Sequence, residues 1–164
     1  MNILLKTRTK DHVVTFWDKT QDKEITRLFP QSIESLEEAL ILFEESLNED
    51  TKSYGKVIYI DEEYIGDIWC YGIDEKNEKM ALLSIVIFKK ELWGKGIATQ
   101  AAKVFVEDTF YKFNIEKIGA FTYSNNYASI GVLLKAGFLE IEQFVEDGSE
   151  SKYFEICDTY YNLM

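Results

Sequence analysis

Basic residues are scarce in this sequence. Its 164 residues include 18 Lys and Arg but 29 Asp and Glu, which gives a formal net charge of −11. Because the phosphates of a nucleic acid require a basic surface, this charge argues against a nucleic-acid partner. The acidity suits a cationic substrate, and it is also typical of ordinary well-solvated domains.

Cysteine, proline and long apolar runs are scarce as well. Cys70 and Cys157 are too few for a disulfide framework and lack metal-ligand spacing, so we expect small core residues and no metal site. Pro30 is the single proline, and no Gly-, Pro- or Ser-rich linker divides residues 1–164, which predicts one domain. The longest apolar run, 80–88, is too short for a membrane helix, and the N-terminus lacks the apolar core of a secretory signal. We therefore expect a cytoplasmic protein without a membrane partner.

Hydrophobic residues are abundant at 46%, and aromatic residues reach 15%, which is typical of a globular domain. Periodicity predicts the order β-α-α-β-β-β-α-β-α-β-β, and hence a mixed sheet flanked by helices, in the α/β or α+β class. The expected elements are a strand at 3–5, a helix from 11 toward 29, a helix opened by a capping box at 35–38, strands at 54–60, 65–71 and 80–88, a helix from 97, a strand at 117–123, a helix at 126–136, and a terminal hairpin of 139–145 and 152–157 around Asp147-Gly148.

The most informative stretch lies where the apolar strand 80–88 gives way to a helical pattern. Between them stands Leu92-Trp93-Gly94-Lys95-Gly96-Ile97-Ala98-Thr99. A strand that turns through two glycines into a helix leaves unpaired N–H groups at the helix start, and such an end binds phosphate. The glycines let the backbone approach the ligand closely. A tight turn without any ligand is the alternative.

A second block follows at 123–138. It opens with Tyr123-Ser124-Asn125-Asn126-Tyr127-Ala128-Ser129 and ends in Gly137-Phe138. The two blocks together resemble the GNAT superfamily of acetyl-CoA-dependent N-acetyltransferases, over nearly the whole chain. The subgroup that the sequence most resembles is the ribosomal-protein N-terminal acetyltransferase type. Trp93 stands where the family signature has Arg or Gln.

The resemblance implies a mostly antiparallel sheet splayed between its fourth and fifth strands, the acyl-CoA N-acyltransferase fold. It implies that the pantetheine arm of acetyl-CoA inserts at the splay and that the pyrophosphate meets the glycine turn. Asn126 faces the pantetheine amides, caps the short helix, or does both. The residues expected to bind the cofactor are Ile87, Phe88, Trp93, Gly94, Lys95, Gly96, Ile97, Ala98, Thr99, Asn126 and Ser129.

The catalytic groups are less specified by the sequence. The subgroup resemblance makes Ser129 a candidate to protonate the departing thiolate, since Leu133 stands where many members have Tyr. Candidate general bases are Asp67 and Tyr71, which strand alternation places on one face, and Glu78. For Asp67 and Tyr71 the alternative is an exposed sheet face.

We therefore expect an N-acetyltransferase in which a primary amine attacks acetyl-CoA directly, without a covalent acyl-enzyme or a metal. The acceptor is a small-molecule or peptide amine, for which the acidity favours a cation. A non-catalytic acyl-CoA-binding module of the same fold is the alternative. The exposed edge of the terminal hairpin permits a homodimer.

Overall fold

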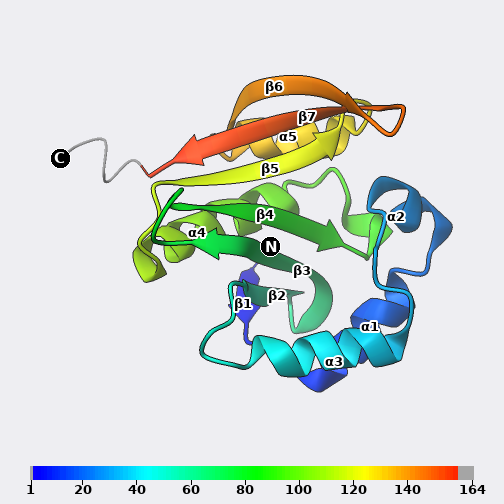
Figure 1. Cartoon of the computed structure of the whole chain (residues 1–164). Helices are drawn as coiled ribbons and strands as arrows, with labels where there is room; N and C mark the ends of the chain where they lie inside the picture. The colour runs from blue at the N-terminus through cyan, green and yellow to red at the C-terminus, as the bar shows by residue number, and fades with distance from the viewer. Residues whose placement is uncertain (1, 159–164) are drawn as a thin grey trace.

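The computed structural model describes residues 2–158 as a seven-stranded sheet with helices on both faces (Figure 1). No helix in this range is long and apolar enough to cross a bilayer. The elements are β1 (Ile3–Lys6), α1 (Lys10–Lys19), α2 (Lys23–Leu28), α3 (Leu36–Ser46), β2 (Tyr54–Ile60), β3 (Glu63–Asp74), β4 (Met80–Ile87), the 3-10 turn η1 (Lys90–Leu92), α4 (Ile97–Lys112), β5 (Lys117–Tyr123), α5 (Tyr127–Lys135), β6 (Leu139–Glu146) and β7 (Ser149–Cys157).

The strands run in the order β1-β2-β3-β4-β5-β7-β6. All neighbours pair antiparallel except β4 and β5, which are parallel. Within the described chain these two strands pair over Met80–Leu82 of β4, and Figure 1 shows them diverging toward their C-terminal ends. The predicted mixed sheet, splayed between its fourth and fifth strands, is confirmed.

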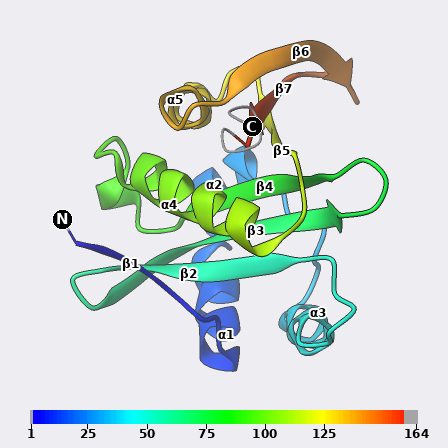
Figure 2. The ribbon, with the colours of Figure 1, turned by 90° about the vertical axis from the view of Figure 1, so that its left-hand side faces the viewer.

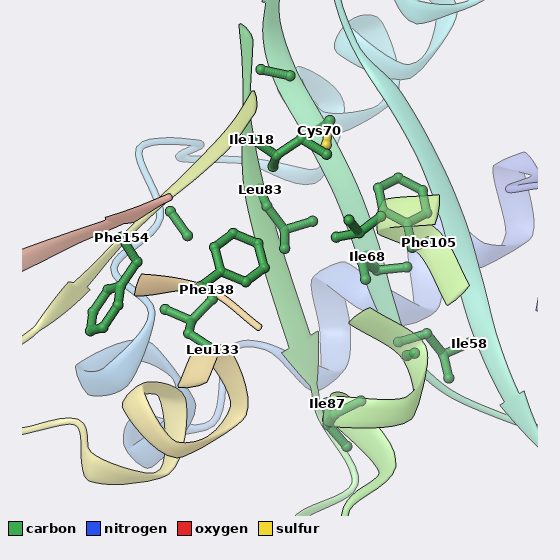
Figure 3. Packing of buried hydrophobic residues seen from close by; sticks show 14 of the residues in the cluster. Ile58, Ile68, Cys70, Leu83, Ile87, Phe105, Ile118, Leu133, Phe138 and Phe154 are labelled. Carbon is green, nitrogen blue, oxygen red and sulfur yellow. The ribbon is translucent and has the colours of Figure 1, made fainter. Parts of the chain in front are cut away.

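Helices α4 and α5 lie together and cover one face of the sheet (Figure 2). This face forms the main core, in which Leu83 of β4, Phe105 of α4 and Phe138 are buried (Figure 3). Ile68 and Cys70 of β3 point into the same core. Burial of these apolar side chains supplies the main stabilisation of the two halves of the sheet around the splay.

A smaller cluster lies on the opposite face, under α1 and α2. Ile25 of α2 packs on Val86 and Phe88, and Trp69 of β3 joins them. The rings of Phe16 and Phe29 meet Trp69 edge-on, with centroids 6.1 and 5.7 Å away. Alternation along β3 therefore separates Ile68 and Cys70 from Trp69, as the period-2 pattern predicts.

The first predicted helix is in fact two, and this expectation was wrong. Helix α1 ends at Lys19, where the Thr20 hydroxyl donates to the Phe16 carbonyl over 2.7 Å. Helix α2 then begins with Asp22 as its N-cap, accepting from the N–H groups of Glu24 and Ile25. The break arises because Thr20 and Asp22 both satisfy helix-end groups with their side chains.

Three further expectations concern the capping box, the terminal hairpin turn and the two cysteines. Ser35 accepts from the N–H of Glu38 as predicted, but the Glu38 carboxylate turns to the N–H of Glu34, so the capping box is only half formed. The hairpin turn at Asp147-Gly148 is confirmed, with φ of 51° and 77°. Cys157, expected in the core, is exposed because it lies at the end of β7, whereas Cys70 is buried as predicted.

Candidate active site

Within residues 2–158, the splay leaves the second half of β4 without a strand neighbour on its β5 side. The N–H of Phe88 donates to the carbonyl of Ile65 on β3 over 3.0 Å. In an antiparallel pair the backbone groups of successive residues point to alternate sides. Those of Ile87 and Ile85 therefore face the gap, where an extended ligand can pair with them.

Helix α4 begins at the same gap. Gly94 and Gly96 have φ of +76° and +80°, left-handed values that favour glycine, and a Cβ at either would meet no protein atom within 4 Å. Gly96 is the N-cap of this 16-residue helix and supplies no capping side chain. The first N–H groups of α4 therefore open onto free space with the positive end of the helix dipole behind them, an arrangement that fits a phosphate.

The Trp93 side chain joins the turn to the strand. Its indole Nε1–H donates to the carbonyl oxygen of Ile87 over 2.8 Å. This carbonyl belongs to a residue whose backbone faces the gap, so the bond holds the free end of β4 against the start of the glycine turn. A Trp at the first signature position thus has a structural function that the sequence did not reveal.

A cavity of about 640 Å³ runs through the gap from one face of the sheet to the other. Among the expected site residues it is lined by Tyr71, Ile87, Trp93, Gly94, Gly96, Ile97, Ala98, Thr99, Asn126 and Ser129. The structure does not bring Phe88, Lys95 or Asp67 to this cavity. Phe88 turns its side chain into the cluster beneath α1 and α2 instead.

Asn126 and Ser129 are coupled at the start of α5. The Oδ1 atom of Asn126 accepts from the N–H of Ser129 over 3.2 Å, so the capping function expected for Asn126 is present. This leaves the amide NH₂ of Asn126 to donate toward the cavity. Leu133, one turn beyond Ser129, is buried and provides no proton.

Asp67 is buried away from the cavity. The hydroxyl of Tyr64 donates to its Oδ1, and Nε of Arg8 lies 3.0 Å from its Oδ2. Burial raises the pKa of Asp67 to about 6, although Arg8 and Tyr64 oppose the shift. Its face of the sheet is therefore covered rather than exposed, and its assignment as a general base stays a prediction.

Tyr71 lines the cavity and is 39% exposed. Burial raises the pKa of its hydroxyl, and a hydrogen bond from Ser84 opposes the shift only in part. The phenol therefore stays protonated near neutral pH, where it can orient an amine or a water but is a poor proton acceptor.

His12, and the two lysines that precede the glycine turn, Lys89 and Lys90, already have partners. Nδ1 of His12 accepts from the N–H of Thr9 over 2.9 Å, which caps the start of α1, and Nε2 lies 2.7 Å from the Tyr59 hydroxyl. Lys89 pairs with Glu63. Lys90 lies 2.7 Å from Asp22.

A family model described as the acetyltransferase (GNAT) domain matches residues 2–139 of the chain. The chain belongs to the GNAT acetyltransferase family. The predicted family, and with it an acyltransferase enzyme, is therefore confirmed. No curated protein matches this sequence.

Solved structures share this fold at low sequence identity. One is a spermidine N-acetyltransferase from Vibrio cholerae in complex with CoA and spermine, at 20% identity and a TM-score of 0.85 over 98% of each chain. Another is the aminoglycoside acetyltransferase AAC(6')-Ib in complex with coenzyme A, at 15% identity and a TM-score of 0.82 over 99% of each chain. At these identities the likeness establishes the GNAT fold.

The far side of the cavity was missed by the sequence reasoning. It is formed by α2 and the residue after it, by β5 and by β6, with Ile25, Leu28, Phe29, Phe121, Phe144 and Glu146 among its walls. No motif marks these residues, because they come from elements far apart in the chain. The one available signal is the alternation that places Phe144 and Glu146 on the same face of β6.

Proposed function

We propose that this GNAT protein is an acetyl-CoA-dependent N-acetyltransferase that transfers acetyl to a primary amine by direct attack in a ternary complex. The observation that supports the proposal best is the uncapped start of α4 beside the unpaired edge of β4. One ligand with a diphosphate and an extended amide-bearing arm fits both features at once.

The chain's own groups would bind this substrate in a definite order. The N–H groups of 94–99 would hold the pyrophosphate, and Gly94 and Gly96 leave room for it. The N–H of Ile87, whose carbonyl oxygen already accepts from Trp93, would pair with the pantetheine arm, and the NH₂ of Asn126 would donate to one of the carbonyls of the arm. Acetyl-CoA supplies an activated thioester, and the N–H of Ile85, farther along β4 from the glycine turn, is suited to bind its carbonyl oxygen.

Of the hydroxyl side chains that line the cavity, those of Tyr71 and Ser129 are the candidates for a role in the reaction. Tyr71 would orient the amine and Ser129 would hold a proton for the departing thiolate. Ser129 is the candidate acid because the side chain of Leu133, where many family members have Tyr, has no proton to donate. Asp67 would act only if a proton could travel to its buried carboxylate, since it lies outside the cavity.

Within the family, we propose the ribosomal-protein N-terminal acetyltransferase type, on the strength of Leu92-Trp93-Gly94-Lys95-Gly96-Ile97-Ala98-Thr99. We further propose one domain over residues 1–164, supported by a single sheet that includes strands from both ends of the described chain. The proposals of a cytoplasmic location and of a homodimer through the exposed edge strand β6 rest on composition and topology.

The test is calorimetry with coenzyme A followed by thiol release from acetyl-CoA with peptides, polyamines, aminoglycosides and amino acids as acceptors. Binding together with amine-dependent release of thiol and formation of an amide supports the proposal. Binding without turnover on every amine would favour the non-catalytic module. Absence of binding at millimolar coenzyme A would overturn both.

A further inference from the structure

The cavity has two ends on opposite faces of the sheet. The start of α4 and α5 lines it on the face that α4 covers, whereas α2, Tyr71 and Phe121 line it on the other. Ala120 of β5 is in the main core, so alternation places Phe121 on the opposite face. If the donor occupies the α4 end, the acceptor must approach from the α2 end.

Apolar and aromatic side chains dominate this second end. Phe29 and Pro30 follow α2, and Tyr71 lies on β3. Phe121 of β5 has its ring 6.0 Å from that of Phe144 on β6, and it is 51% exposed. Exposed aromatic rings gathered in a cavity mark a binding surface for apolar groups.

Charge is nearly absent from the same walls. Among the described residues that line the whole cavity, Lys135 and Glu146 alone carry charged side chains. Glu142 lies on the same face of β6 as Glu146 but outside the lining, and Glu155 is engaged by Lys117 over 3.4 Å. The described walls of the cavity therefore offer a cation one carboxylate, that of Glu146, and a set of aromatic faces.

We infer that the acceptor is a primary amine with a single positive charge carried next to an apolar or aromatic group, and not a polyamine or an aminoglycoside. This inference rests on the proposed N-acetyltransferase function. A second or third ammonium group in this cavity would lose water against Phe121, Phe144 and Pro30 without gaining a carboxylate. An aromatic side chain would instead be buried against the same surfaces.

The two sources of such an amine are a free arylalkylamine and a peptide with an apolar first residue. The probes are 2-phenylethylamine, a tetrapeptide beginning with Phe, the same peptide beginning with Ser, spermidine and kanamycin. Each is tested by isothermal calorimetry in the presence of saturating coenzyme A and by initial rates of thiol release from acetyl-CoA. The first two probes separate the sources, and the Ser peptide isolates the contribution of the aromatic group.

We expect the probes with a phenyl group to bind and react about ten- to hundredfold better than the Ser peptide and the polycations, the ratio that corresponds to burying one aromatic side chain. Phe144→Ala should reduce that advantage about tenfold. Val145→Ala is the matched control, because Val145 is the next residue on β6, is exposed, points to the other face and does not line the cavity. It should leave the advantage unchanged.

Two outcomes would overturn the inference. In one, spermidine or kanamycin binds and reacts better than both phenyl probes. In the other, Phe144→Ala and Val145→Ala change the preference equally. Failure of the proposed function would look different, since no amine would then promote thiol release although the protein bound coenzyme A, or coenzyme A itself would not bind.

Discussion

Replacing Gly96 with alanine tests the phosphate site with little disturbance elsewhere. The residue has a φ of +80°, and the new Cβ would meet no protein atom within 4 Å. The cost to the fold is therefore the left-handed backbone alone, about 1–2 kcal/mol. For a chain of this size that corresponds to a drop of about 2–8 °C in Tm.

The cost to ligand binding should be larger. The added methyl group would stand in the open space before α4, where a phosphate must approach the N–H groups at the helix start. Loss of one or two hydrogen bonds to a charged group weakens binding about ten- to hundredfold. Calorimetry with coenzyme A measures this directly, and thermal unfolding of the same sample measures the stability.

Gly148→Ala is the matched control. Gly148 has a φ of +77° and equally open surroundings, but it lies in the β6–β7 turn and does not line the cavity. Both variants should lose similar stability, and only Gly96→Ala should lose affinity for coenzyme A. Equal affinities in the two variants would refute the placement of the pyrophosphate at this turn.

Three further substitutions test the gap and the buried acid. Trp93→Phe removes the indole hydrogen bond to the Ile87 carbonyl, so it should cost about 1 kcal/mol of stability and weaken coenzyme A binding several-fold. Unchanged binding by calorimetry would show that the β4 edge holds its position without this hydrogen bond. Asn126→Asp keeps the side-chain oxygen that accepts from the N–H of Ser129 but removes the NH₂ donor, so the Tm should stay the same while the KM for acetyl-CoA rises. Equal KM values in the variant and the wild type would mean that Asn126 caps α5 and does not bind acetyl-CoA. In the folded protein the pKa of Asp67 is raised to about 6, so ionisation of this carboxyl opposes folding as the pH rises from about 4 to about 6. Urea unfolding should therefore show the wild type losing stability relative to Asp67→Asn across this pH range. A stability difference that stays constant with pH would contradict the raised pKa.

Local features of the sequence predicted much of the donor side. The run Gly94-Lys95-Gly96 predicts a turn because glycine readily adopts the positive φ that Gly94 and Gly96 have here. The helix that follows is predicted by the helical spacing of its own apolar residues. The same holds for the hairpin at Asp147-Gly148, where a two-residue turn with positive φ joins two strands. Such signals lie within a few residues of one another, so they can be interpreted without the fold.

Other features depend on contacts between distant segments. The period-2 pattern placed Asp67 on the face of Trp69, but not beneath α1 with Arg8 and Tyr64 as partners. The break between α1 and α2 was missed because Thr20 and Asp22 cap helix ends only in their folded setting.

The sequence by itself determined the family, the glycine turn and the separation of the two cores by strand alternation. The tertiary structure alone decided which side chains gather around the gap: Trp93 bonds to the carbonyl of Ile87 on its β4 side, and the rings of Phe121 and Phe144 lie together on its β5 side. The physical reason is that turns and periodicity arise from the backbone preferences of neighbouring residues, whereas a cavity wall arises from how a twisted, splayed sheet brings separate strands and a helix together.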